Sequence, residues 1–182
     1  MKIIYFGTDK HSELVLDRII KANNPIHLVV TLPDSIKSRG NKKSPTPVKG
    51  FCKRKNIDFK VNMPNKDEIN KISPDIIIVA SYGKIIPEYI LKKSKYGAIN
   101  LHPSLLPKYR GPSPVQTAII NDEKISGTSI ILLNEISQGV NEAEKHLTIE
   151  GIAYSGSSGN AIARVEISTD GGRSWVKARL RS

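Results

Sequence analysis

The regular alternation of two kinds of segment constrains the fold of this chain more than any other feature. Five short apolar runs, rich in β-branched residues, are typical of strands buried on both faces. They are Lys2–Phe6, His27–Leu32, Asp75–Ala80, Ala98–Leu101 and Thr128–Leu133. Between them lie five segments with helical spacing, several with proline in the first turn: Ser12–Lys21, Pro47–Lys55, Lys66–Ile72, Pro87–Lys93 and Pro112–Asn121. This order predicts a doubly wound α/β fold with a mostly parallel sheet.

Length and composition are those of an ordinary globular protein. With 182 residues and 38% hydrophobic content, the chain can bury one core and a small appendage. Its start has only four consecutive apolar residues, and no apolar run reaches membrane length, so we expect no signal peptide and a cytoplasmic protein. The single cysteine, Cys52, excludes an internal disulfide framework and a cysteine-based zinc site. We expect it to be a buried or half-buried helix residue.

The last part of the chain follows a different pattern. Residues 161–168 (AIARVEIS) and 174–180 (SWVKARL) alternate like half-buried strands, and the turn between them has Asp-Gly at its centre. Residues 147–156 add a third predicted strand. The sequence therefore predicts an α/β domain over 1–136, a junction over 137–146, and a short antiparallel β fragment over 147–182.

Positive charge is concentrated in one segment. Residues 37–60 hold nine basic residues and one acidic residue, which is eight of the chain's eleven net positive charges. A composition that was merely rich in lysine would spread this charge more evenly. The clustering favours a surface that contacts phosphate, with a simple solvated face as the alternative.

The fold predicts where a ligand binds. In open α/β sheets, ligands lie at the carboxyl ends of the strands, so we expect Gly7, residues 81–83 and residues 100–102 at that edge. Gly7 has no further glycines around it, and the sequence therefore lacks a dinucleotide-binding fingerprint. His11 and His27, which flank a predicted helix and strand, are expected to be surface or edge residues.

Asn100 and His102 are the residues with the clearest chemical potential. Two residues apart on an extended chain, they point to the same side. A histidine can accept a proton from an attacking amine and return it to a leaving group, and an amide can hold a carbonyl oxygen as it becomes negative. This pair suits acyl or formyl transfer. Taken alone, it is also compatible with a hydrogen-bonded structural histidine.

Longer motifs strengthen the first interpretation. Residues 99–116 (INLHPSLLPKYRGPSPVQ), 5–8 (YFGT), 79–87 (VASYGKIIP) and 38–49 (SRGNKKSPTPVK) occur in this order along the chain. Together they closely resemble the N-terminal catalytic domain of the methionyl-tRNA formyltransferase family. The resemblance covers about residues 1–135, and the RGPSPVQ continuation is what distinguishes the tRNA enzymes from their purine-pathway relatives.

The resemblance implies roles for specific residues. Asn100 would stabilise the oxyanion and His102 would act as acid and base. The folate side would be formed by Ser104, Leu105, Leu106 and Pro107, and the pterin pocket would be walled by Val79, Ala80, Ser81, Tyr82 and Gly83. The tRNA would be contacted by Arg39, Lys42 and Lys43. The implied donor is formyl-tetrahydrofolate, the implied acceptor is the amino group of initiator methionyl-tRNA, and no metal is implied.

One departure from the family pattern concerns the partner of His102. The family has an aspartate after the strand that corresponds to Thr128–Leu133, and ungapped counting places Asn141 there. An amide accepts a hydrogen bond but does not balance an imidazolium. The same replacement in a serine-protease triad costs roughly 10⁴-fold in turnover, so we expect impaired activity. Glu142 or Glu144 could substitute only if the loop bends.

The second departure is the tail. Residues 147–180 are similar to part of the immunoglobulin-like dimerisation domain of sulfite-oxidase-type molybdenum enzymes, covering about three strands of a sandwich that needs about seven. The chain thus joins two unrelated fragments, and no molybdenum chemistry is implied. The alternative to an impaired formyltransferase is an inactive fold that binds folate or tRNA weakly. In that case the tail would close a sheet edge or make a contact between copies of the chain.

Overall fold

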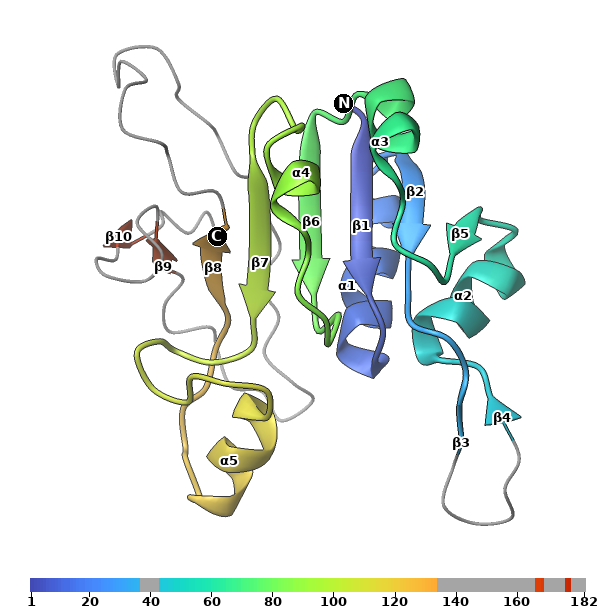
Figure 1. Ribbon diagram of the computed structural model, residues 1–182. Helices are drawn as coiled ribbons and strands as arrows, with labels where there is room; N and C mark the ends of the chain where they lie inside the picture. Colours follow the sequence, from blue (N-terminus) through green and yellow to red (C-terminus); the bar gives the residue numbers. More distant parts are fainter. Residues whose placement is uncertain (37–42, 134–165, 169–175, 178–182) are drawn as a thin grey trace. The chain divides into compact units, whose positions relative to one another are not determined.

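A computed structural model describes residues 1–36, 43–133, 166–168 and 176–177 (Figure 1). The chain forms two compact units, Met1–Ala98 and Ile99–Ser182. Each unit has its own secondary structure.

The first unit contains a four-stranded parallel sheet. Its strands are β1 (Ile3–Gly7), β2 (Ile26–Val30), β5 (Phe59–Lys60) and β6 (Ile76–Ala80), in the order β6-β1-β2-β5. Every residue of β1 and β6 is buried, as the uninterrupted apolar runs predict for strands covered on both faces. The parallel direction in this unit confirms the prediction from the alternating pattern.

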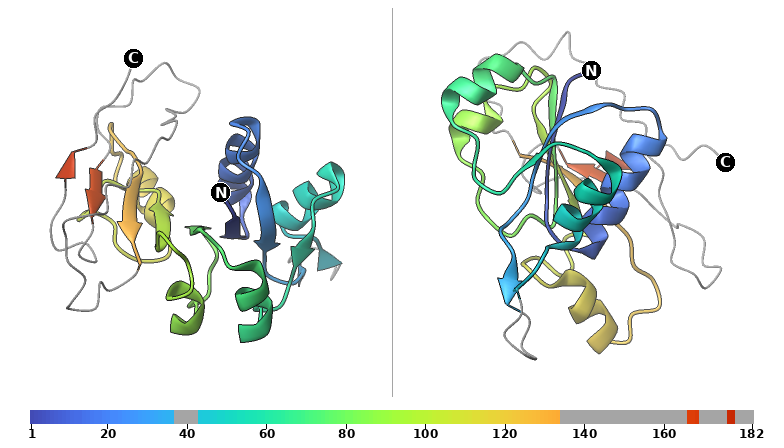
Figure 2. Two further views of the ribbon diagram at one scale, coloured as in Figure 1. Left: turned by 90° about the horizontal axis from the view of Figure 1, so that it is seen from above. Right: turned by 90° about the vertical axis from the view of Figure 1, so that its right-hand side faces the viewer.

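Four helices cover this sheet. They are α1 (Lys10–Lys21), α2 (Pro47–Lys55), α3 (Lys66–Ile72) and α4 (Glu88–Leu91). Figure 2 shows α1 and α2 on one face of the sheet and α3 and α4 on the other, which confirms the doubly wound arrangement. The bounds of α2 and α3 agree with the prediction because both begin at strong signals: proline at the first turn of α2, and a capping box between Asn65 and Glu68 in α3.

Three very short strands were not predicted. β3 (Ser35–Ile36) and β4 (Lys43–Ser44) form a small antiparallel pair, and β5 lies at the edge of the parallel sheet. A strand of two residues shows no hydrophobic period, so the sequence pattern carries no signal for it.

The first unit has a well-packed core in which the few polar groups are satisfied. The buried Tyr5 hydroxyl donates to the Ser12 carbonyl oxygen at 2.7 Å, which ties β1 to α1. The rings of Phe6 and Tyr82 meet edge to face at 5.2 Å. Cys52 is fully buried in α2, as expected, and burial raises the pKa of its thiol to about 11.

The second unit is built around β7 (Ala98–His102), α5 (Pro114–Ile120) and β8 (Ser129–Leu132). The two strands pair antiparallel, with His102 opposite Ser129, which is an exception of the kind that the predicted mostly parallel sheet allows. The connection between the two strands contains a turn and the seven-residue helix α5. It brings the first residue of β8 next to the last residue of β7. Ser129 Oγ holds this arrangement by donating to the Ser104 carbonyl oxygen at 2.8 Å.

The described residues of the tail continue this sheet. β9 (Glu166–Ser168) runs parallel to β8, and β10 (Val176–Lys177) runs antiparallel to β9, which confirms the predicted hairpin pairing. The third predicted strand, 147–156, lies outside the described residues, as does the junction at 137–146. Within the described part of the chain, no helix is both long and apolar enough to cross a membrane.

Candidate active site

Asn100 and His102 occupy the carboxyl-terminal half of β7, where both are half-buried. Alternation along the strand places their side chains on one face, as predicted from the spacing. Among the described residues, the Asn100 side-chain amide has no hydrogen-bond partner. It is therefore a donor available to an oxygen atom of a ligand.

The imidazole of His102 has one hydrogen bond to the described part of the chain. Its Nε2 atom lies 3.0 Å from the backbone carbonyl oxygen of Tyr109. Because a carbonyl oxygen can only accept, Nε2 carries the proton, and in the neutral ring Nδ1 is the basic nitrogen. No carboxylate of residues 1–36 or 43–133 hydrogen-bonds this ring, and Asn141, Glu142 and Glu144 lie outside the described residues.

The segment after β7 is a tightly bonded turn. The Ser104 backbone N–H donates to the His102 carbonyl oxygen at 2.8 Å, and Ser104 Oγ donates to the Lys108 carbonyl oxygen at 2.8 Å. The Leu106 N–H donates to Ser129 Oγ at 3.1 Å, and the Leu106–Pro107 peptide is cis. Ser104 and Leu106 are buried, whereas Leu105 is half-buried and Pro107 is exposed.

A pocket of about 780 Å³ opens beside this turn. It lies between two segments of the second unit, Leu105–Tyr109 and Asn121–Ser126. The first segment contributes apolar side chains and the second is mostly polar. Three of the four residues predicted for the folate side thus line a pocket together.

Tyr109 and Glu123 face each other across this region, and sequence reasoning did not identify either of them. The Tyr109 hydroxyl donates to Glu123 Oε1 at 2.5 Å, and Lys108 Nζ lies 2.9 Å from the same oxygen. These two contacts, the tyrosine hydrogen bond first, hold the pKa of the Glu123 carboxyl below its usual value. The sequence gives no signal for this contact. The two residues are 14 positions apart, and each has the pattern of an ordinary polar surface residue.

The residues predicted for the pterin pocket lie in the first unit at the end of β6. Val79, Ala80 and Tyr82 are buried, whereas Ser81 is half-buried and Gly83 is exposed. Ser81 and Gly83 both have positive φ, 44° and 81°, and form a sharp turn after the strand. The side chains that remain accessible to a ligand from this segment are therefore few, and backbone groups dominate the turn.

His11 lies beside this turn. Its Nδ1 is 3.5 Å from Ser81 Oγ, and the ring is half-buried, unlike that of the exposed His27. Burial lowers the pKa of His11, and the nearby Asp9 carboxylate opposes this effect. The expectation of a plain surface or edge residue holds for His27 and is incomplete for His11.

Part of the basic segment is neutralised by ion pairs. Lys49 contacts Asp34 at 2.6 Å, Arg54 contacts Glu13 at 2.9 Å, and Lys60 pairs with Glu68. Lys43 is exposed in β4, whereas Arg39 and Lys42 lie outside the described residues. The positive charge available to a phosphate-binding surface is thus smaller than the number of basic residues suggests. It comes from basic residues other than Lys49, Arg54 and Lys60.

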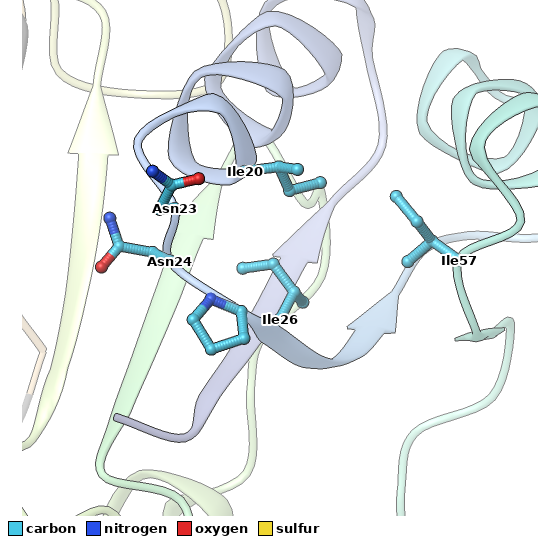
Figure 3. A pocket seen from close by; sticks show the side chains of 6 residues that line it. Ile20, Asn23, Asn24, Ile26 and Ile57 are labelled. Carbon is cyan, nitrogen blue, oxygen red and sulfur yellow. The ribbon is translucent and has the colours of Figure 1, made fainter.

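A second pocket, of about 460 Å³, lies in the first unit at the amino-terminal end of β2. Figure 3 shows the Ile20, Ile26 and Ile57 side chains around it, with Asn23 and Asn24 on the loop after α1. No charged side chain lines it, and it lies away from the carboxyl ends of the strands. It is a poor place for proton transfer.

The chemistry available at the site is that of an amide donor and an imidazole. Nowhere in the described residues do three His, Cys, Asp or Glu side chains gather as metal ligands would. The Asn100 amide and the His102 ring fit a reaction in which an acyl carbonyl is attacked by an amine.

Comparisons with known proteins agree with this chemistry. Residues 1–140 match the family model described as formyl transferase, and residues 118–182 match the Mo-co oxidoreductase dimerisation domain. The methionyl-tRNA formyltransferase of Dictyoglomus thermophilum is 45% identical over 141 residues, which are 74% of this chain and 45% of that protein. That of Thermotoga maritima is 38% identical over 156 residues, 82% of this chain and 50% of that protein. The chain spans about half the length of the curated relatives it matches.

Solved structures show the same fold. A phosphoribosylglycinamide formyltransferase from Bacillus halodurans superposes with a TM-score of 0.55 at 18% identity, covering 89% of this chain and 84% of that one. Its counterpart from Streptococcus pneumoniae gives 0.53 at 18% identity, with coverage of 88% and 86%. At this identity the likeness concerns the fold alone. Since the formyl transferase model matches residues 1–140, most of the chain, this protein belongs to the formyl transferase family.

Proposed function

We propose that this chain transfers the formyl group of formyl-tetrahydrofolate to the amino group of methionyl-tRNA. The observation that carries the proposal is the pairing of Asn100 and His102 on one face at the end of β7, with the Asn100 amide unpartnered in the described part of the chain. The names of the relatives, which are methionyl-tRNA formyltransferases, support the choice of substrates.

Asn100 fits the role of oxyanion donor. As an amine attacks the formyl carbon, negative charge develops on the formyl oxygen, and an N–H group already aimed at that position lowers the barrier. The half-buried position of Asn100 partly excludes water, which strengthens such a hydrogen bond. Its Nδ2 would hold the formyl oxygen.

His102 fits the role of acid and base through Nδ1. The attacking amine must lose a proton, and the basic nitrogen of the neutral ring is Nδ1 because Nε2–H is bonded to the Tyr109 carbonyl oxygen. The same nitrogen would return the proton to the nitrogen that leaves the formyl group. The ring therefore completes the proton cycle without a metal ion.

The remaining predicted residues would bind the two substrates. When bound, the folate would supply an activated formyl group, and the Leu105 and Pro107 side chains and the turn at Ser81 and Gly83 would hold it. On the acceptor side, Lys43 with Arg39 and Lys42 would contact the tRNA phosphates.

Substitution of the two central residues tests the proposal. Formyl transfer from formyl-tetrahydrofolate to methionyl-tRNA is measured for the full chain and for its His102→Gln and Asn100→Ala variants. We expect losses of about 10²–10⁴-fold for His102→Gln and about 10²–10³-fold for Asn100→Ala. His27→Gln, which changes an exposed histidine, is the matched control and is expected to keep the parent rate. Parent-like rates in His102→Gln would contradict the assignment.

A second candidate function is binding without transfer. It is favoured by Asn141, which stands where the family pattern has an aspartate. In this case calorimetry would detect weak binding of folate or tRNA to the parent chain, whereas the assay would show no formyl-methionyl-tRNA above the uncatalysed background.

A further inference from the structure

We propose that Glu123 is a positioning residue for His102, acting through Tyr109. The inference rests on the proposed function, because it assigns Glu123 to the histidine that serves there as acid and base. All three residues lie in the second unit. His102 is hydrogen-bonded to Tyr109, and Tyr109 is hydrogen-bonded to Glu123.

The first link is the bond between His102 Nε2–H and the Tyr109 carbonyl oxygen, at 3.0 Å. It selects one tautomer of the neutral ring and directs Nδ1 away from Tyr109. In many sites a carboxylate has this orienting role, whereas here the acceptor is a neutral carbonyl oxygen. The orientation of the His102 ring therefore depends on how firmly the Tyr109 backbone is held.

The second link is the conformation of Tyr109. Its φ of 56° lies in the left-handed region, which is unfavourable for a residue with a bulky side chain. Such a conformation persists where other contacts determine it. The side chain provides that contact, since its hydroxyl donates to Glu123 Oε1 at 2.5 Å.

The third link is the anchoring of Glu123 itself. Its backbone N–H donates to the Ala118 carbonyl oxygen at 3.0 Å, which attaches it to the end of α5. The same Oε1 accepts from Lys108 Nζ at 2.9 Å, and the Asn121 amide donates to the Tyr109 hydroxyl at 3.2 Å. One carboxylate thus holds two consecutive residues of the turn, Lys108 and Tyr109, and is itself three-quarters shielded from solvent.

The chain therefore carries a carboxylate that acts on His102 indirectly. Glu123 orients the ring through a side chain and a backbone carbonyl, and it does so from within residues 99–133. An aspartate at the position of Asn141 would act on the ring directly. The two devices differ in one testable respect, because only the Glu123 route depends on the Tyr109 hydroxyl.

The ¹⁵N chemical shifts of the His102 ring report its tautomer. We expect the parent chain to hold the Nε2–H tautomer, and Tyr109→Phe and Glu123→Ala to give a mixture of the two tautomers. In the transfer assay the same variants are expected to lose about tenfold in kcat with little change in KM, since the base is misaligned and not removed. Glu123→Gln keeps an oxygen acceptor for the hydroxyl and should restore both readouts most of the way.

Glu88→Ala is the matched control, because Glu88 is an exposed glutamate of the first unit that pairs with Lys92 and does not line the pocket beside the turn. An unchanged His102 tautomer in both Tyr109→Phe and Glu123→Ala overturns the inference. If Glu123→Ala does not fold, Tyr109→Phe, which removes one oxygen atom, decides alone. A tautomer that responds in a chain without transfer activity would overturn the proposed function and leave the positioning role intact.

Discussion

The imidazole of His102 has two nitrogen atoms, and the fold uses one of them to orient the ring. With Nε2–H bonded to the Tyr109 carbonyl oxygen, the unprotonated Nδ1 can accept a hydrogen bond from the reacting amine, whereas it could donate to a carboxylate only after it has taken up a proton. The amine and a carboxylate therefore do not bind Nδ1 in the same protonation state. At the scale of a residue, the geometry leaves Nδ1 as the proton acceptor for the substrate.

Asn141→Asp tests whether a direct carboxylate improves the base. Asn141 lies outside the described residues, at the position where the family pattern has aspartate. If the loop brings this position near the ring, the charge of the carboxylate would stabilise the imidazolium that forms when Nδ1 accepts a proton, without a hydrogen bond to Nδ1. The kcat for formyl transfer should then rise at least about tenfold, within the roughly 10⁴-fold that the reverse change costs in a protease triad.

Asn62→Asp, which alters an exposed amide of the first unit, is the matched control for charge. Equal rates for the parent and Asn141→Asp, or no transfer by either, would instead favour the function of binding without transfer.

At the scale of an element, Gly7 shows how closely α1 approaches β1. A Cβ atom at this position would overlap Ser12 Oγ and lie 2.7 Å from the Tyr5 ring. The same two residues are joined by the buried Tyr5 hydrogen bonds. Glycine is therefore required here for packing, between the end of the first strand and the start of the first helix.

Gly7→Ala should lower the free energy of unfolding by about 1–3 kcal/mol, because the overlap forces Ser12 or Tyr5 to move. Gly50→Ala is the matched control: in α2 the new Cβ would meet only the end of the Arg54 side chain, at 3.3 Å, and alanine favours the helix. We expect it to add up to about 1 kcal/mol. Urea unfolding curves measure both changes, and a Gly7→Ala variant as stable as the parent would disprove the packing argument.

Element boundaries and the parallel direction of the strands in the first unit were largely predictable, whereas the direction of β8 was not. All five strands and all five helices predicted for residues 1–136 exist, and the bounds of α2 and α3 agree to the residue. The antiparallel pairing of β7 and β8 could not be read from their apolar patterns, since both directions bury the same residues. It depends on Ser129 Oγ contacting the Ser104 carbonyl oxygen and the Leu106 N–H.

At the scale of the whole molecule, charge predicts a nucleic-acid surface. Because Lys49, Arg54 and Lys60 are paired with acids, we expect phosphate contacts mainly from the basic residues that have no acidic partner in the described part of the chain, Lys43 among them. Replacing Arg39, Lys42 and Lys43 together with alanine should weaken tRNA binding. The slope of log affinity against log salt should become shallower by about 2–3, since about one counterion is released for each phosphate contact.

The control for this prediction removes the same charge elsewhere on the chain. Its substitutions are Lys71→Ala, Lys93→Ala and Lys95→Ala, at three exposed positions of the first unit. This variant should keep most of the parent slope. A salt slope that is the same in the two triple variants and the parent would rule out phosphate contact by the 39–43 segment.

The described residues of the tail extend the sheet of the second unit. β9 adds to β8 in parallel and β10 completes the hairpin, so the described part of the tail covers the strand that follows α5. Residues 118–182 match a dimerisation domain, and the match overlaps the formyl transferase match over residues 118–140. The overlap of the two matches therefore includes β8, which pairs with both β7 and β9.

The amino-acid sequence by itself determined the alternating elements, the Asn100–His102 pair and the family motifs, because periodicity and residue chemistry are local properties of the chain. Only the tertiary structure decided that β8 runs antiparallel to β7, that Tyr109 holds the His102 ring, and that Glu123 holds Tyr109. Those facts depend on which distant groups the folded loops bring within hydrogen-bond distance. No local pattern records such partners, since Lys108, Tyr109 and Glu123 read singly as ordinary polar residues.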